Sequence, residues 1–98
     1  MNQHKNIKNL LKKIIKDLND LKAIDIKFID IKNRSALGDF LVITSGTSSR
    51  HINSIASKII EYNKKKVISV EGLKSTEWVI VDFGDIILNI FKPETREY

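Results

Sequence analysis

The first part of the chain repeats apolar residues with the period of a helix. Between Met1 and Leu21, apolar positions recur at spacings of three and four, with lysines and asparagines between them. This spacing is typical of a helix that buries one face. The apolar stripe consists of Ile7, Leu10, Leu11, Ile14, Leu18 and Leu21. We therefore expect a helix over Met1–Leu21 that packs on the strands that follow it.

The period then changes to two, which indicates strands. Ile24–Ile31 is rich in β-branched residues, with Ile24, Ile26 and Phe28 expected on one side. Lys32–Ser35 reads as a loop. A second strand is expected over Phe40–Ser45, ending before Gly46.

A second helix follows, introduced by hydroxyl side chains that favour a helix N-cap. Thr47, Ser48 and Ser49 supply these hydroxyls. The apolar stripe of this helix is Ile52, Ile55, Ala56 and Ile59. The helix is expected to stop near Lys64–Lys66, before a short strand over Val67–Val70.

The last third has the pattern of a β-hairpin. Glu77–Asp82 and Asp85–Phe91 flank Phe83-Gly84, which we take as a two-residue turn, and Pro93 closes the final strand. This turn would place Trp78 opposite Asn89. One face of the hairpin is entirely apolar and is predicted to face the core: Val79, Val81, Ile86, Leu88 and Ile90.

The other face of the hairpin mixes aromatic, aliphatic and acidic side chains. It carries Trp78, Ile80, Asp82, Asp85, Ile87, Asn89 and Phe91. Such a mixture favours a protein-binding surface, with Trp78 as its anchor. Two alternatives stay open: the first helix or the C-terminal tail covers this face, or Trp78 is a core residue.

Composition narrows the class of protein. The 98 residues suffice for one modest core, and no cysteine is present for a disulfide, a thiolate metal site or a nucleophile. No apolar run is long enough to span a membrane, so the expected location is the cytoplasm. The net charge of +5 comes mainly from lysines, which either attract an acidic partner such as RNA or form a solvated face.

Each catalytic motif that the chain suggests is incomplete. Gly46-Thr47-Ser48-Ser49 lies between a strand and a helix, where anions bind, but it is not a Walker motif, and no Asp-x-Asp pair follows to hold magnesium. Asp82-Phe83-Gly84 matches the kinase magnesium triplet without the other kinase motifs. His4 and His51 lack a metal-spaced partner. We therefore expect no catalytic, metal-ligating or cofactor-binding residues and no enzyme activity.

Several segments together resemble one family, the ribosomal silencing factors or Iojap-like proteins. The matching segments are Lys22-Ala23-x-Asp25-Ile26 followed by Asp30, Asp39–Ile52, Glu71-Gly72, Glu77-Trp78-Val79, Asp82-x-Gly84-Asp85 and Phe91-x-Pro93-Glu94-x-Arg96-Glu97-Tyr98. The resemblance implies a single α/β (α+β) domain over residues 1–98. Its mixed sheet of about five strands would be packed by helices, as in nucleotidyltransferases without the catalytic acids.

The resemblance also implies a function and a partner. Proteins of this family bind a ribosomal protein on the intersubunit face of the large subunit, with rRNA nearby, and hinder joining of the small subunit. They thereby repress translation, and the family is also linked to large-subunit biogenesis. A homodimer through the exposed sheet is a further expectation.

Carried over by position, the binding surface would centre on Trp78, Ile80 and Asp82. Weaker candidates are Asp85, Asn89, Phe91 and Arg96. Asn89 stands where the family more often has His. The resemblance assigns no partner contact to the other signature residues, which are Thr47, Ser48, Arg50, His51 and Glu71. A capped turn explains them equally well.

Two other functions remain as alternatives. A generic RNA-binding module would lose affinity steeply with salt and respond little to loss of Trp78. A nucleotidyltransferase-like enzyme, the less favoured alternative, would turn over nucleotides with magnesium.

Overall fold

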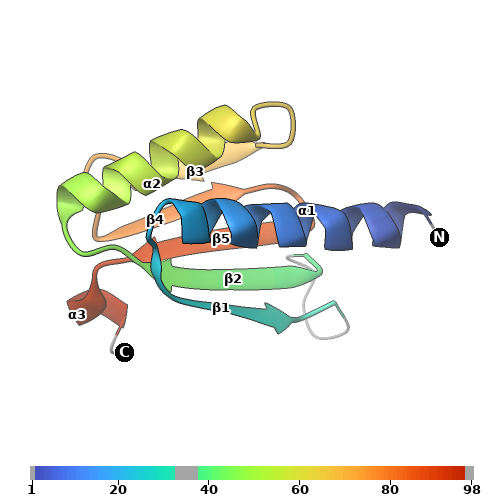
Figure 1. Ribbon diagram of the computed structural model, residues 1–98, viewed down its shortest axis with the longest axis horizontal. Coiled ribbons are helices and arrows are strands. Elements are labelled where there is room, and N and C mark those ends of the chain that lie inside the picture. The colour runs from blue at the N-terminus through green and yellow to red at the C-terminus, as the bar shows by residue number, and fades with distance from the viewer. Residues whose placement is uncertain (1, 33–37, 97–98) are drawn as a thin grey trace.

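A five-stranded mixed sheet carries two helices on one of its faces (Figure 1). This computed structural model describes residues 2–32 and 38–96. The elements are α1 (Asn2–Asp20), β1 (Ile24–Asp30), β2 (Phe40–Ser45), α2 (Ser49–Tyr62), β3 (Ser69–Glu71), β4 (Trp78–Asp82), β5 (Ile86–Phe91) and α3 (Pro93–Arg96). Most of the predicted loop Lys32–Ser35 lies outside the described residues.

The strands lie in the order β1-β2-β5-β4-β3. β2 and β5 are parallel, whereas the other neighbouring pairs are antiparallel. The parallel pair arises because the chain leaves β2 through α2 and returns to the sheet through β3 and β4. The mixed sheet that the family resemblance implies is confirmed.

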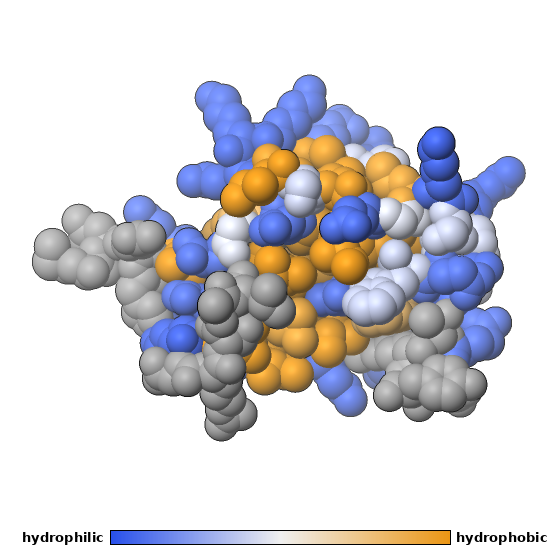
Figure 2. All heavy atoms as spheres, turned by 180° about the vertical axis from the view of Figure 1, so that it is seen from behind, coloured by the Kyte–Doolittle hydropathy of each residue, from blue (hydrophilic) through white to orange (hydrophobic). Residues whose placement is uncertain are grey.

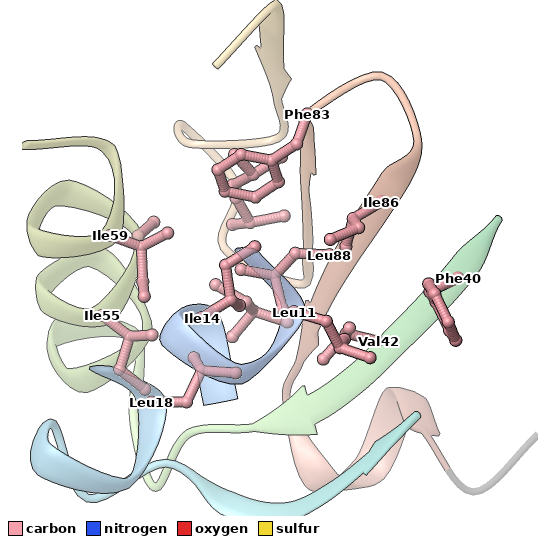
Figure 3. Packing of buried hydrophobic residues seen from close by; sticks show 14 of the residues in the cluster. Leu11, Ile14, Leu18, Phe40, Val42, Ile55, Ile59, Phe83, Ile86 and Leu88 are labelled. Carbon is pink, nitrogen blue, oxygen red and sulfur yellow. The ribbon is translucent and has the colours of Figure 1, made fainter. Parts of the chain in front are cut away.

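The core fills the space between the helices and the sheet. The middle of the α1 stripe is buried at Leu11, Ile14 and Leu18, and the predicted α2 stripe is fully buried. Figure 3 shows these side chains converging on Val42, Ile86 and Leu88 of the sheet. Each buried Leu or Ile contributes about 1.5–3 kcal/mol relative to an exposed one, so this cluster fixes the helices on one face.

The helix ends are tied by polar side chains. Ser48 is the N-cap of α2, and its Oγ accepts from the His51 backbone N–H at 3.1 Å. Asn63 caps the other end, with Nδ2 donating to Ile59 O at 2.8 Å. Lys13 of α1 donates from Nζ to Asn63 Oδ1 at 3.0 Å, which links the two helices.

The predicted strand register of the hairpin was wrong by two residues, because the turn lies one residue further along the chain than expected. Phe83 N–H donates to Ile86 O at 2.9 Å, so the turn is Gly84-Asp85, and Trp78 lies opposite Phe91. Burial explains the shift: Phe83 is 7% exposed and packs in the core on the same side as Val81. Gly84, with φ of +91°, supplies the left-handed conformation.

Two strand predictions also need correction. β1 has a register shift between Ile24 and Lys27, where Asp25 has φ of +52°, so its alternation is not strict. β3 starts at Ser69 rather than at Val67. Its start is delayed because Asn63 O accepts the backbone N–H groups of Lys66 and Val67 in the turn after α2.

Candidate protein-binding face

The face of the sheet opposite α1 and α2 forms a hollow of about 590 Å³, here called the open face. Figure 2 shows this side of the molecule, with hydrophobic residues gathered at its centre. The residues that line the open face are Ile31, Leu41, Ile43, Trp78, Ile80, Asp82, Ile87, Asn89 and Phe91. Six of the seven residues of the predicted mixed face are therefore brought together.

β2 and the residue after β1 widen this face beyond the hairpin. Leu41 and Ile43 lie beside Ile87 and Asn89 in the parallel register, and Ile31 completes the lining. Sequence reasoning missed these three residues because it considered the hairpin alone. The alternation in β2 was the available signal: Phe40 and Val42 are buried, and Leu41 and Ile43 point the other way.

Helix α1 does not cover the open face, because it packs on the opposite side of the sheet. That alternative is wrong. The other proposed cover, the C-terminal tail, includes Glu97 and Tyr98, which lie outside the described residues.

Trp78 is held in place while much of its ring stays accessible. Its ring stacks on Phe91, with centroids 5.1 Å apart and planes 25° apart. Its Nε1–H donates to Asn89 Oδ1 at 2.9 Å. The side chain nevertheless remains 48% exposed, so the alternative of a core tryptophan is wrong. An ordered, half-exposed indole suits an interface anchor because little further ordering is needed on binding.

Asn89 joins the core of the sheet to this indole. It is 6% exposed, and its Nδ2 donates to Val42 O at 3.4 Å. The same amide accepts from Trp78 through Oδ1. Asn89 therefore supports the surface from below and presents little of its own area.

Asp82 supplies the negative charge of the open face. Its Oδ1 accepts from the Gly84 N–H at 2.7 Å, so the hairpin turn fixes the carboxylate. It is the acidic residue among those that line the hollow. A carboxylate next to an apolar hollow can pair with a cationic side chain of a partner.

Two predicted site residues do not join the open face. Asp85, in the corrected turn, lines a second hollow together with Asn6, Lys13 and Lys66, on the side of α1. Its placement on the mixed face was wrong because the turn begins one residue later than expected. Arg96 ends α3, and its side chain lies outside the described part of the structure.

The signature residues around His51 form a structural junction. Thr47 N–H donates to His51 Nδ1 at 2.9 Å. A neutral His51 ring therefore carries its proton on Nε2, and this N–H donates to Leu21 O at 3.0 Å. The ring thus links the end of α1 to the start of α2. Gly46 is required beside it, since an added Cβ would lie 2.6 Å from Ile52 Cγ1.

This junction favours the capped turn over an anion site. The Thr47 and His51 backbone N–H groups already donate to side chains of the same turn. Arg50 and Glu71 are exposed, and the structure gives no role for either. Across residues 2–32 and 38–96, no group of three His, Asp or Glu side chains is arranged to hold a metal ion. None of the described helices is long and apolar enough to cross a membrane.

Comparisons with known proteins give consistent relatives. A family model described as "Ribosomal silencing factor during starvation" matches residues 4–98. The ribosomal silencing factor of Zymomonas mobilis is 38% identical over 92 residues, covering 91% of this chain and 69% of that protein. The ribosomal silencing factor of Haemophilus influenzae is 32% identical over 91 residues, covering 90% of this chain and 89% of that protein.

Further matches include a mitochondrial protein and solved structures. A mouse protein named for mitochondrial assembly of the ribosomal large subunit is 32% identical over 81 residues, covering 76% of this chain and 36% of that protein. A crystal structure from Chromobacterium violaceum has a TM-score of 0.87 at 28% identity, covering 94% of this chain and 79% of that one. A second crystal structure, from Bacillus halodurans, has a TM-score of 0.81 at 26% identity, covering 93% of this chain and 88% of that one.

Proposed function

Because the chain belongs to the ribosomal silencing factor family, we propose that it binds a protein of the large ribosomal subunit through its open face. The bound molecule lies on the intersubunit face of the large subunit, close to rRNA, and blocks joining of the small subunit. Translation by cytoplasmic ribosomes is thereby repressed. The observation that carries the proposal is an apolar sheet face that neither α1 nor α2 covers, lined by an ordered, half-exposed Trp78.

The chemistry of the open face matches the centre of a protein interface. Such centres are rich in aromatic residues and poor in charge, and an anchoring Trp contributes more than its neighbours. Trp78 and Phe91 provide the aromatic part, and Ile80 and Ile87 the aliphatic part. Asp82 provides a place for a lysine or arginine, which ribosomal proteins offer because they must neutralise RNA.

Occlusion requires no bond to be made or broken. The molecule measures 39 × 28 × 21 Å along its principal axes. Even its shortest dimension far exceeds the distance over which side chains or bases make contact. One copy docked by its open face would therefore hold the two joining surfaces apart, so an inactive ribosomal subunit follows from steric exclusion alone.

A subunit-joining assay tests this function. Isolated small and large subunits are mixed under joining conditions with increasing amounts of protein, and joined ribosomes are measured on sucrose gradients. The proposal predicts that the protein migrates with the large subunit and that joined ribosomes decrease as it is added. Migration with both subunits equally, or undiminished joining at saturating protein, would contradict it. Nucleotide turnover with magnesium would instead favour the enzyme alternative.

A further inference from the structure

The outward side of α1 carries a row of lysines. Lys5, Lys8, Lys12 and Lys16 follow each other at spacings of three and four and form one side of the helix, here called the lysine stripe. All four are exposed, and the stripe points away from the buried Leu11, Ile14 and Leu18. Of these four lysines, only Lys16 forms an ion pair within the described residues, with Nζ 3.0 Å from Asp20 Oδ2. The hydrogen bond to Asp20 raises the pKa of Lys16.

A second group of lysines extends this surface. Lys64, Lys65 and Lys66 are exposed in the turn after α2. Lys66 lines a hollow of about 610 Å³ together with Asn6, Asn9 and Lys13 of α1, so the turn lies beside the N-terminal half of that helix. Asp85 also lines this hollow and is the acidic residue in its lining. Lys13 itself is neutralised by Asp17 at 2.9 Å.

The excess charge of the chain is concentrated on this surface. The lysines without an ion pair here are Lys5, Lys8, Lys12, Lys64, Lys65 and Lys66. Without these six lysines and Asp85, which lines the hollow beside them, the rest of the sequence has 11 basic and 11 acidic residues and is neutral. The positive field is therefore directed from the helix side of the molecule, opposite the open face.

We propose that the lysine stripe and the Lys64–Lys66 turn bind the phosphate backbone of RNA while the open face binds protein. That this RNA is ribosomal rests on the proposed function. Lys5 and Lys12 are about 10 Å apart along the helix axis, which allows contact with more than one phosphate. α1 contains no Phe, Tyr or Trp for base stacking, so the lysine stripe contacts the phosphate backbone and reads no base sequence.

The structure favours RNA over a membrane surface as the polyanion. A membrane-bound amphipathic helix inserts its apolar face into the lipid. The apolar face of α1 is already buried against α2 and the sheet. Phosphates on a folded RNA can be reached by the lysines alone, without moving the helix.

The test uses two triple variants with the same change of charge. Lys5→Gln/Lys8→Gln/Lys12→Gln removes the stripe and keeps good helix formers. Lys27→Gln/Lys32→Gln/Lys74→Gln removes three exposed lysines elsewhere. Affinity for a fluorescently labelled RNA duplex is measured by anisotropy at several salt concentrations, after circular dichroism has shown that both variants are folded.

We expect the stripe variant to bind the duplex about tenfold more weakly or worse. The slope of its log affinity against log salt concentration should be shallower by about 2 to 3, and the affinity of the control should stay within about threefold of wild type. Equal weakening of both variants would overturn the proposal, because binding would then follow net charge. Lack of binding by the wild type would also overturn it, as would lysine-dependent binding to anionic vesicles alone.

Sedimentation with large subunits separates this inference from the proposed function. Trp78→Ala should weaken sedimentation with the large subunit and leave duplex affinity unchanged. A wild type that binds the duplex through the stripe but ignores large subunits would refute the proposed function only. A wild type that sediments with large subunits but does not bind the duplex would refute the RNA surface only.

Discussion

The amide of Asn89 connects the interior of the sheet to the exposed indole of Trp78. Since Oδ1 accepts from the indole and Nδ2 is anchored on Val42 O, the ring orientation depends on a buried side chain that scarcely touches solvent. The position was predicted as a contact residue from the resemblance. Its positioning role required the structure, because a hydrogen bond between neighbouring strands depends on the register.

Asn89→Leu should therefore weaken large-subunit binding by about fivefold, equivalent to about 1 kcal/mol for one hydrogen bond. Trp78 is the only tryptophan of the chain, so its fluorescence emission should shift in the same variant. Asn89→His, which keeps an acceptor nitrogen and a donor, is the control and should preserve both readouts. Unchanged emission and affinity in Asn89→Leu would show that the hydrogen bond does not position the ring.

His51 is a residue for which the sequence offered two equal explanations. The structure favours the junction between α1 and α2. We expect His51→Ala to lower the free energy of unfolding by about 1–3 kcal/mol, since it leaves a donor and an acceptor without their partner. Urea denaturation measures this, and Arg50→Ala, an exposed neighbour, should stay within about 0.5 kcal/mol. A fully stable His51→Ala protein that no longer binds large subunits would instead make His51 a contact residue.

At the scale of elements, local patterns predicted the helices and the sides of the strands. The α2 stripe and the middle of the α1 stripe are buried as expected, and Val79, Val81, Ile86, Leu88 and Ile90 all face the core. Apart from Asp85, the hairpin faces were correct although the register was wrong, because a shift of two residues preserves the alternation. Phe83-Gly84 resembles a two-residue turn in sequence, but burial of the Phe83 ring in the core moves the turn to Gly84-Asp85.

Phe83→Ala tests the corrected hairpin. Because the ring is 7% exposed within the core cluster, its loss should cost about 3–5 kcal/mol in the free energy of unfolding. Ile68→Ala, at a side chain that is 69% exposed, serves as the control and should cost far less. A cost below about 1 kcal/mol for Phe83→Ala would be the result expected of an exposed turn residue.

At the scale of the whole molecule, the arrangement of strands could not be read from local patterns. The parallel pairing of β2 with β5 joins residues far apart in the sequence, and it brings Leu41 and Ile43 onto the open face. Only the family resemblance predicted a mixed sheet. The separation of an apolar face from a lysine-rich face depends on that arrangement, since it requires both helices to pack on one side.

The measurement that tests the central claim most directly compares two exposed aromatic residues. Trp78 on the open face and Tyr62 on α2 are 48% and 47% exposed, so each is replaced by Ala and binding to isolated large subunits is measured. The account predicts that Trp78→Ala weakens binding by about 30-fold or more, equivalent to about 2 kcal/mol, while the protein stays folded. Tyr62→Ala should bind as the wild type does. Equal affinities for Trp78→Ala and the wild type would show that the open face is not the binding surface.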